Sequence, residues 1–375
     1  MLMQLTTFHA ARLLAAAFTL ALACAPAAVA EPAPGARTIG EPKLIIVTFD
    51  GVRWQEIFRG ADEKIAKDEK YVAKDWFEDG VDKPYLKPAN RPAALAPFLH
   101  EVVATQGVLI GNRDAGECAR VANDMWFSYP GYNELLTGKP DPRIVENDDK
   151  WNENVTFLEH LNRADAFKGQ VHMLGTWSLF DKIVNSKRSG IPVNAQFAGR
   201  GPTDAMTWRF GREVMQTKKP RVLYLAFGDT DEFAHDGDYM SYLASIERGD
   251  DVLRQIWEFV QADPYYRGQT TLIVTTDHGR GDVQPGAWKD HSAVRYHQLN
   301  PRYQPQYNRT GVIGADNVWF AAIGPAVNRS GAAAYRGGAC AETRQAAASA
   351  LSLLGQDWRA FDAGAGAPFA FISGR

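Results

Sequence analysis

Cysteine is scarce in this sequence. The 375 residues include three cysteines, and this scarcity excludes the small secreted domains that disulfides hold together. Cys24 lies in the N-terminal leader described below, so Cys118 and Cys340 are the two in the remainder of the chain. In an oxidising compartment this pair permits one disulfide, but the sequence is equally compatible with two separate buried thiols.

An excess of either charge is also absent. Lys and Arg total 41, Asp and Glu total 44, and the formal net charge is −3. A protein built to bind nucleic acid usually has a basic excess, so we expect no nucleic-acid-binding surface. Apolar residues make up 45 % of the chain and charged residues 23 %, a balance typical of folded globular proteins and not of disordered ones.

Long apolar runs are confined to the N-terminus. Arg12 precedes an apolar run over residues 13–23, and Ala28-Val29-Ala30 has the small-x-small pattern of a cleavage site. We interpret residues 1–30 as a signal peptide and therefore expect export to the periplasm or the medium. A retained membrane anchor and lipoprotein processing at Cys24 are the alternatives.

The remainder of the chain contains no run long enough to span a bilayer, so we expect no transmembrane segment after cleavage. Residues 31–42 are rich in Pro, Gly and Ala and are interpreted as a linker. Residues 43–375 are expected to form a single domain, in which the charged, proline-broken segment 60–95 is a surface insertion. The sequence does not indicate an oligomeric state.

Short apolar segments rich in β-branched residues alternate with helical patterns along this domain. Strands buried on both faces and separated by helices are typical of a parallel sheet. We therefore predict an α/β fold with a doubly wound, mostly parallel sheet and helices on both faces. The expected strands are residues 43–50, 171–177, 221–227, 270–276 and 317–323, and the expected long helices are 238–262 and 342–354.

Three of these strands lead directly into metal-binding side chains. Asp50 ends the first strand, Asp231 and His235 follow the second, and Asp277 and His278 follow the third. Ligands of such sheets bind beyond the carboxyl ends of the strands, so these side chains should meet at one edge. A buried carboxylate there is costly unless it is paired or bound to a metal.

Imidazole and carboxylate together suit Zn²⁺, with Mn²⁺ as the alternative. The four-residue spacing from Asp231 to His235 places both side chains on one face if a helical turn follows the strand. His291, after Asp290, is a further candidate ligand. Each residue alone is as easily a helix cap or a hydrogen-bonded histidine, but the whole set is harder to explain in that way.

A nucleophile is expected in a turn near these ligands. Ser128 lies between aromatic residues, directly before Pro130-Gly131, and we expect a helix to start near Tyr132. The free N–H groups and the dipole of a helix N-terminus favour a bound phosphate. The alternative is that Ser128 only caps the helix.

In their order along the chain, these residues resemble the alkaline phosphatase superfamily, and most of all its type I phosphodiesterase/nucleotide pyrophosphatase-like branch. The similarity extends over residues 44–325. The resemblance implies two divalent metal ions beside the serine. It assigns one ion to Asp231, His235 and His291, and the other to Asp50, Asp277 and His278, with Ser128 bridging toward the substrate.

The segment around Ser128 bears on the substrate. It reads Ser128-Tyr129-Pro130-Gly131, where related diesterases often have Thr-Phe-Pro-Asn, which disfavours nucleotides. A sulfatase needs Arg where this chain has Tyr132, so that reaction is disfavoured too. Asn133 is a candidate for a hydrogen bond to a phosphoryl oxygen, and a solvent-facing position on the helix is the equal alternative. Arg280 and Lys289 are candidates for adding positive charge at the substrate, although solvated surface charges are the more common case. Asp229 is a candidate partner of the metal ligands.

The sequence therefore predicts an exported two-metal hydrolase of small phosphoric esters, either monoesters or diesters. Ser128 is expected to attack phosphorus and form a phosphoserine intermediate, because a neighbouring divalent cation stabilises the alkoxide. The main alternative is a phosphotransferase similar to phosphoglycerate mutase. A sulfatase and a non-catalytic module that binds metal or phosphate are less favoured.

Overall fold

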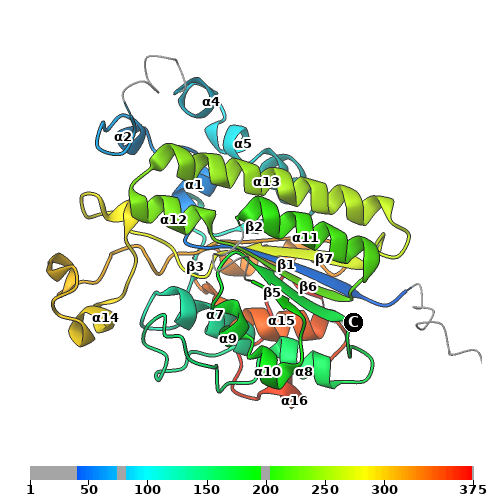
Figure 1. Ribbon diagram of the computed structural model, residues 1–375. Helices are drawn as coiled ribbons and strands as arrows, with labels where there is room; N and C mark the ends of the chain where they lie inside the picture. The colour runs from blue at the N-terminus through cyan, green and yellow to red at the C-terminus, as the bar shows by residue number, and fades with distance from the viewer. Residues whose placement is uncertain (1–39, 74–81, 196–202, 374–375) are drawn as a thin grey trace, which may run out of the picture. The chain divides into compact units, whose positions relative to one another are not determined.

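Figure 1 shows a computed structural model of the chain. The structure describes residues 40–73, 82–195 and 203–373. The chain divides into two units, residues 1–38 and 39–375, and all of the described residues belong to the second. The predicted signal peptide, Cys24 and most of the linker lie outside the described residues.

A seven-stranded sheet forms the centre of the described part of the chain, in the order β2-β8-β7-β1-β6-β4-β5. Apolar, β-branched residues fill its inner strands, which are buried along their whole length, as the sequence predicts. The strands are β1 (Lys43–Phe49), β2 (Val108–Ile110), β4 (Val171–Gly175), β5 (Val193–Asn194), β6 (Val222–Phe227), β7 (Thr270–Thr275) and β8 (Phe320–Ile323).

The sheet is mostly parallel. β1 pairs in parallel with β6 on one side and with β7 on the other, and β4 and β5 continue the parallel set beyond β6. β8 runs antiparallel to β7 and to β2. The carboxyl ends of β1, β6 and β7 therefore lie next to one another, with β1 in the middle.

Helices cover both faces of the sheet (Figure 1). Leu44 and Ile46 of β1 belong to one core, together with α7 (Ser128–Thr137), α8 (Phe157–Arg163) and α15 (Ala346–Leu353). Ile45 and Val47 belong to the other, together with α11 (Asp204–Thr217) and α13 (Tyr239–Ala262). This alternation within one strand confirms the predicted doubly wound architecture.

The remaining elements are short. The described parts of the expected surface insertion, residues 60–73 and 82–95, also contribute to the core, because Tyr71, Tyr85 and Leu95 are buried in the core that α13 covers. The short helices are α1 (Trp54–Arg59), α2 (Glu63–Ala66), α4 (Asp82–Leu86), α5 (Arg91–Leu95), α6 (Ala104–Gln106), α9 (Phe180–Ile183), α10 (Ser186–Ser189), α12 (Asp229–Asp236), α14 (Val294–Leu299) and α16 (Trp358–Phe361). A π-helix covers Phe98–Val103. Within the described ranges, no helix combines the length and apolar character needed to cross a bilayer.

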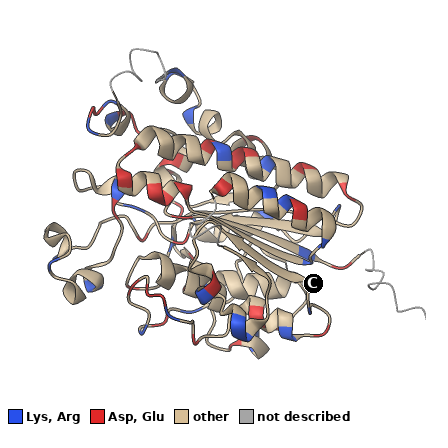
Figure 2. Cartoon of the chain, viewed as in Figure 1, with Lys and Arg blue, Asp and Glu red and all other residues tan. Residues whose placement is uncertain are grey.

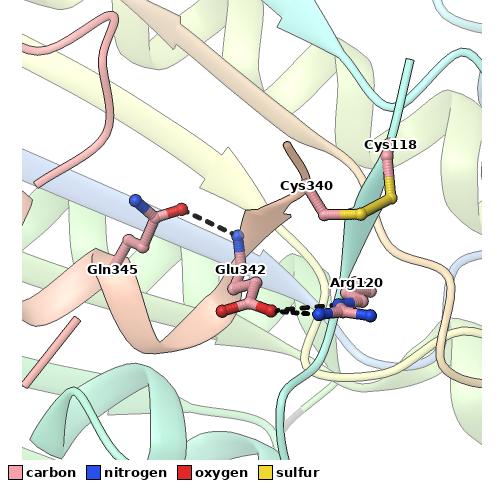
Figure 3. Close-up of a disulfide and its surroundings, with 5 residues drawn as sticks. All are labelled: Cys118, Arg120, Cys340, Glu342 and Gln345. Carbon is pink, nitrogen blue, oxygen red and sulfur yellow. Dashed lines mark hydrogen bonds and ion pairs between the residues drawn. A yellow bond between two sulfur atoms is a disulfide. The ribbon is translucent and has the colours of Figure 1, made fainter. Parts of the chain in front are cut away.

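A disulfide joins Cys118 to Cys340 (Figure 3). Each cysteine directly precedes a strand, β3 (Ala119–Arg120) or β9 (Ala341–Glu342), and these two strands pair in parallel. Arg120 of β3 forms an ion pair of 2.6 Å with Glu342 of β9. Of the two arrangements compatible with the sequence, the structure therefore has the disulfide and not two separate thiols.

Candidate active site

The six predicted metal ligands meet at the carboxyl edge of the sheet. Two of them, Asp231 and His235, lie on α12, which follows β6. His291 lies beyond β7, in the loop after Lys289. In this first triad, the Nε2 atom of His235 lies 3.1 Å from Nε2 of His291 and 3.4 Å from a carboxylate oxygen of Asp231. His291 Nε2 lies 3.9 Å from Asp231. The three side chains together offer one atom each to a common centre.

The second triad lies at the ends of β1 and β7. Nε2 of His278 is 3.4 Å from Oδ1 of Asp50 and 3.4 Å from Oδ2 of Asp277. The other oxygens have partners: Asp50 Oδ2 accepts a hydrogen bond from Tyr132, and Asp277 Oδ1 accepts one from the N–H of Gly51. Asp50 Oδ1 and Asp277 Oδ2 are buried and accept no hydrogen bond. A cation is the partner that such oxygens require.

Backbone carbonyl groups fix the orientation of two of the histidines. Nδ1 of His278 lies 2.9 Å from the carbonyl oxygen of Gly279, and Nδ1 of His291 lies 3.0 Å from that of Trp126. A carbonyl oxygen only accepts, so each Nδ1 carries a hydrogen, and Nε2 is the ring nitrogen that faces the site. This is the usual arrangement of metal-binding histidines.

The spacing of the ligand atoms fits a tetrahedral metal ion. Bonds of about 2.0–2.1 Å at tetrahedral angles place neighbouring ligand atoms about 3.4 Å apart. Four of the measured separations, between His235 and His291 or from a histidine to a carboxylate oxygen, lie at 3.1–3.4 Å, and the fifth, from His291 to Asp231, is 3.9 Å. All ligand atoms of each triad lie within 4.8 Å of one another, and the donor set of imidazoles and carboxylates, with two unpartnered oxygens, fits a divalent cation.

Electrostatics at the site favour bound cations as well. Burial raises the pKa of Asp50 and of Asp277 well above the ordinary range, and nearby carboxylates raise both further. Burial lowers the pKa of His291 and of His235, which favours the neutral imidazole that a metal ligand must be. Figure 2 shows further acidic residues in red along α12, the helix that carries Asp231.

Arg280 is an integral part of the site and is completely buried. Its guanidinium forms an ion pair with Asp231 and donates a hydrogen bond of 2.9 Å to the carbonyl of Gly51. Burial acts to raise the pKa of Asp231, but Arg280, His235 and His278 bring it below the ordinary value. The sequence leads us to expect Arg280 at the substrate, whereas the structure places its guanidinium on a predicted metal ligand.

Ser128 lies beside the second triad, with its Oγ atom 3.3 Å from Nε2 of His278. The structure corrects the predicted start of the helix: α7 begins at Ser128 and not near Tyr132. Proline is tolerated in the first turn of a helix, so Pro130 does not delay the start. Phe127, in extended conformation, precedes the helix, so Ser128 is the first helical residue and not the N-cap.

Tyr132 is a site residue that the sequence analysis did not assign to the site. It lies one helical turn after Ser128, is completely buried and donates a hydrogen bond of 3.0 Å to Asp50. The i, i+4 spacing from Ser128 was the signal in the sequence, because such residues share one face of a helix. Tyr132 therefore orients a predicted metal ligand from the helix that carries the serine.

Asn133 does not join the site. Its Oδ1 accepts hydrogen bonds from the amides of Asn152 and Asn154, at 3.2 and 3.0 Å, and its own amide donates to the carbonyl of Lys139. These bonds tie α7 to the segment 139–154. The structure thus joins the Asn133 side chain to this segment, and a contact between Asn133 and a phosphoryl group stays a prediction.

Lys289 and Asp229, the other two residues expected near the substrate or the metal ligands, lie at the two ends of α12. The aliphatic part of Lys289 packs beside Gly237, at the end of α12, and its carbonyl accepts a hydrogen bond from Arg280. Asp229 begins α12, and its Oδ1 accepts a hydrogen bond of 3.3 Å from the N–H of Asp204. Asp231, and not Asp229, lies in the triad.

A cavity of about 490 Å³ opens beside Ser128. Its size is that of a small-molecule site. Asp231 and His235 of the first triad and Asp50 of the second border the cavity, and aromatic, hydroxyl and acidic side chains complete its lining. The residues that line it are Asp50, Ser128, Asn147, Thr176, Trp177, Ser178, Thr203, Gly228, Asp229, Asp231, Glu232 and His235.

Comparisons with known proteins agree with this geometry. Residues 204–293, which include five of the six predicted ligands, match the Metalloenzyme superfamily. No curated protein matches the chain.

Solved structures show the same fold at low sequence identity. Murine ectonucleotide pyrophosphatase/phosphodiesterase 5 is 14 % identical, with a TM-score of 0.50, over 83 % of this chain and 95 % of its own. The human protein of the same name is 14 % identical, with a TM-score of 0.50, over 83 % and 94 %. The C-terminal periplasmic domain of EcEptC from Escherichia coli is 10 % identical, with a TM-score of 0.52, over 87 % and 85 %. These findings confirm the expected resemblance and the alkaline phosphatase-like fold.

Proposed function

From the alkaline phosphatase-like fold of this chain and its Metalloenzyme superfamily segment, we propose that it is an exported two-metal hydrolase of small phosphoric esters. One observation carries the proposal. Two triads of carboxylate and imidazole groups meet at one edge of the sheet, and the buried Ser128 contacts His278 of the second triad and lines a cavity with ligands of both; two carboxylate oxygens in the second triad are buried without a hydrogen-bond partner.

In this proposal Asp231, His235 and His291 hold one divalent ion, and Asp50, Asp277 and His278 hold the other. Zn²⁺ is the first choice and Mn²⁺ the second, because both accept mixed nitrogen and oxygen ligands. When bound, two such ions lower the pKa of a nearby hydroxyl and stabilise the charge on the attacking and leaving oxygens of an in-line displacement.

The side chains of this protein supply the rest of the reaction. Ser128 Oγ attacks phosphorus, a bond forms between Oγ and phosphorus, and the bond from phosphorus to the leaving oxygen breaks. Water then cleaves the phosphoserine and releases phosphate or a phosphate monoester. Tyr132 and Arg280 keep Asp50 and Asp231 in place through the whole cycle.

Replacing Ser128 by alanine tests the proposal directly. The Zn²⁺-loaded protein is assayed with p-nitrophenyl phosphate and bis-p-nitrophenyl phosphate, which also distinguishes a monoesterase from a diesterase. We expect hydrolysis of at least one ester, and a loss of at least about 1000-fold in Ser128→Ala, since nucleophilic catalysis is lost.

Ser178→Ala is the matched control, because this exposed serine lines the same cavity but lies outside both triads. Full activity in Ser128→Ala would contradict the assignment of the nucleophile. Release of the intact phosphoryl group to a second alcohol, with no free phosphate formed, would favour the phosphotransferase alternative.

A further inference from the structure

One buried carboxylate holds the segment that leads into Ser128. Glu134 lies on α7, six residues after Ser128, and is completely buried. Its carboxylate accepts hydrogen bonds from the backbone N–H of Ala122 at 2.9 Å, from the N–H of Asn123 at 2.7 Å and from the side-chain amide of Asn123 at 2.9 Å. The hydroxyl of Thr343 donates a fourth.

Asn123 extends this network toward the site. Its Oδ1 accepts hydrogen bonds from the N–H of Met125 at 3.0 Å and from that of Trp126 at 2.9 Å. These bonds hold Trp126 in the left-handed region, with φ of 51°, which is uncommon for a residue other than glycine. Backbone strain of this kind persists where the surrounding contacts determine it.

Trp126 is the point at which the network reaches a predicted metal ligand. Its carbonyl oxygen accepts the hydrogen bond of 3.0 Å from Nδ1 of His291. The carbonyl of Met125 accepts one of 2.8 Å from the N–H of Ala293, two residues further along the same loop. The ring of Phe127, next in the chain, lies against the ring of His291, with centroids 4.7 Å apart.

We infer that Glu134 is a positioning residue of the reaction centre, an inference that rests on the proposed metal sites. Through Asn123 it fixes the carbonyl of Trp126, and this carbonyl sets the direction of His291 Nε2. Because Glu134 and Ser128 share α7, the same carboxylate fixes the position of the serine relative to His291 of the first triad.

The chemistry of the network requires a carboxylate. All four partners of Glu134 are neutral donors, and an ionised carboxylate has acceptor sites for all of them. A glutamine at this position would keep one acceptor oxygen and turn an N–H₂ group toward donors. A buried donor without an acceptor costs about 1–3 kcal/mol, so the segment 122–127 would move to relieve the conflict.

The disulfide lies beside the two strands that precede these donors in the sequence, and Figure 3 shows it with Arg120 and Glu342 of those strands. Ala122 and Asn123 follow β3, and Thr343 directly follows β9. The two strands pair beside the bond from Cys118 to Cys340. The strand pairing and the disulfide therefore hold together the two segments, 122–123 and 343, that donate to Glu134.

The test is Zn²⁺ binding, measured by titration against a competing chelator, for the wild type and for Glu134→Gln. We expect one of the two sites to bind Zn²⁺ about 10–100-fold more weakly in Glu134→Gln, since that is the usual cost of losing a group that orients a ligand. The other site should keep its affinity. Circular dichroism of the metal-free proteins checks that both are folded.

Glu159→Gln is the matched control. Glu159 is also a completely buried glutamate on a helix, but its carboxylate pairs with Arg163 and Arg188 and not with the segment 122–123. We expect both Zn²⁺ sites to be unchanged in this variant. Equal weakening of both sites in both variants would show a general effect of losing a buried carboxylate and would overturn the inference.

Asn123→Ala keeps the inference testable if Glu134→Gln does not fold. This change removes the acceptor of the Met125 and Trp126 amides and leaves Glu134 with three donors. The same single site should weaken. Unchanged binding at both sites in a folded Glu134→Gln or Asn123→Ala protein overturns the role of Glu134, whereas a wild type that binds no Zn²⁺ overturns the proposed function instead.

Discussion

At the scale of single residues, the site depends on close approaches that leave no room for a side-chain atom. Gly131, in the first turn of α7, faces the backbone of Asp277. A Cβ atom at residue 131 would lie 2.5 Å from the carbonyl oxygen of Asp277, closer than real contacts of this kind. The helix that carries Ser128 therefore packs directly on the backbone of a predicted metal ligand, and Gly131 makes this packing possible.

Gly131→Ala should consequently disturb the reaction more than the fold. The clash is with backbone, so α7 or Asp277 must shift, and a misplacement of about 1 Å can reduce turnover by about 100-fold. We expect kcat to fall by about that factor in steady-state hydrolysis of the better p-nitrophenyl ester. Gly338→Ala, at a position with open space, is the control. Unchanged kcat in Gly131→Ala would show that the packing of α7 on Asp277 does not matter.

Residues of the site differ in how far the sequence predicts them. Asp50, Asp231 and Asp277 are predictable because a carboxylate at the end of an apolar strand needs a partner. The direction of a side chain on a helix depends on tertiary packing, so the sequence does not indicate that Tyr132 contacts Asp50 or that Glu134 accepts from Ala122.

At the scale of elements, the strands follow from the sequence more directly than the helix ends do. β1, β6 and β7 are apolar throughout, a pattern that fits a strand buried on both faces. α7 starts earlier than the sequence predicts, because Pro130 and Gly131 suggest a turn although a first helical turn accepts both. The pairing of Cys118 with Cys340 depends on the approach of β3 to β9, which the local sequence does not encode.

A contact between α13 and the π-helix Phe98–Val103 should make the free energy of unfolding depend on pH. Asp250 of α13 accepts hydrogen bonds from the N–H groups of Phe98 and Leu99, at the start of the π-helix. Burial raises the pKa of Asp250 to about 7, although both N–H groups lower it. A carboxyl group whose pKa is raised on folding stabilises the protein below its unfolded pKa, and this contribution is lost as the pH rises to about 7.

Asp250→Asn should remove that dependence. Relative to the variant, the free energy of unfolding of the wild type should fall by about 2–4 kcal/mol between pH 4 and pH 8, since one pKa unit is worth about 1.4 kcal/mol. Urea denaturation at several pH values measures this difference. Asp251→Asn, at the exposed neighbour, keeps Asp250 and is the control: the free energy of unfolding of the wild type relative to this variant should show no such decline. A constant difference between wild type and Asp250→Asn would show that Asp250 does not titrate in this range.

At the scale of the whole molecule, segments far apart in the sequence build one site. The sheet order places β1 between β6 and β7, although β6 and β7 follow it by more than 170 and 220 residues. Asp50, Asp231 and Asp277 meet for that reason alone. α7 then brings Ser128 to the same edge from the core on one face of the sheet.

The metal content of the purified chain tests the central claim most directly. Metal-free protein is prepared by exhaustive chelation and then titrated with Zn²⁺, with stoichiometry read by elemental analysis and activity followed in parallel. We predict two Zn²⁺ ions per chain, the same two in Ser128→Ala, and hydrolysis that vanishes on chelation and returns with Zn²⁺ or Mn²⁺. Full hydrolytic activity in protein that contains no metal would contradict the account.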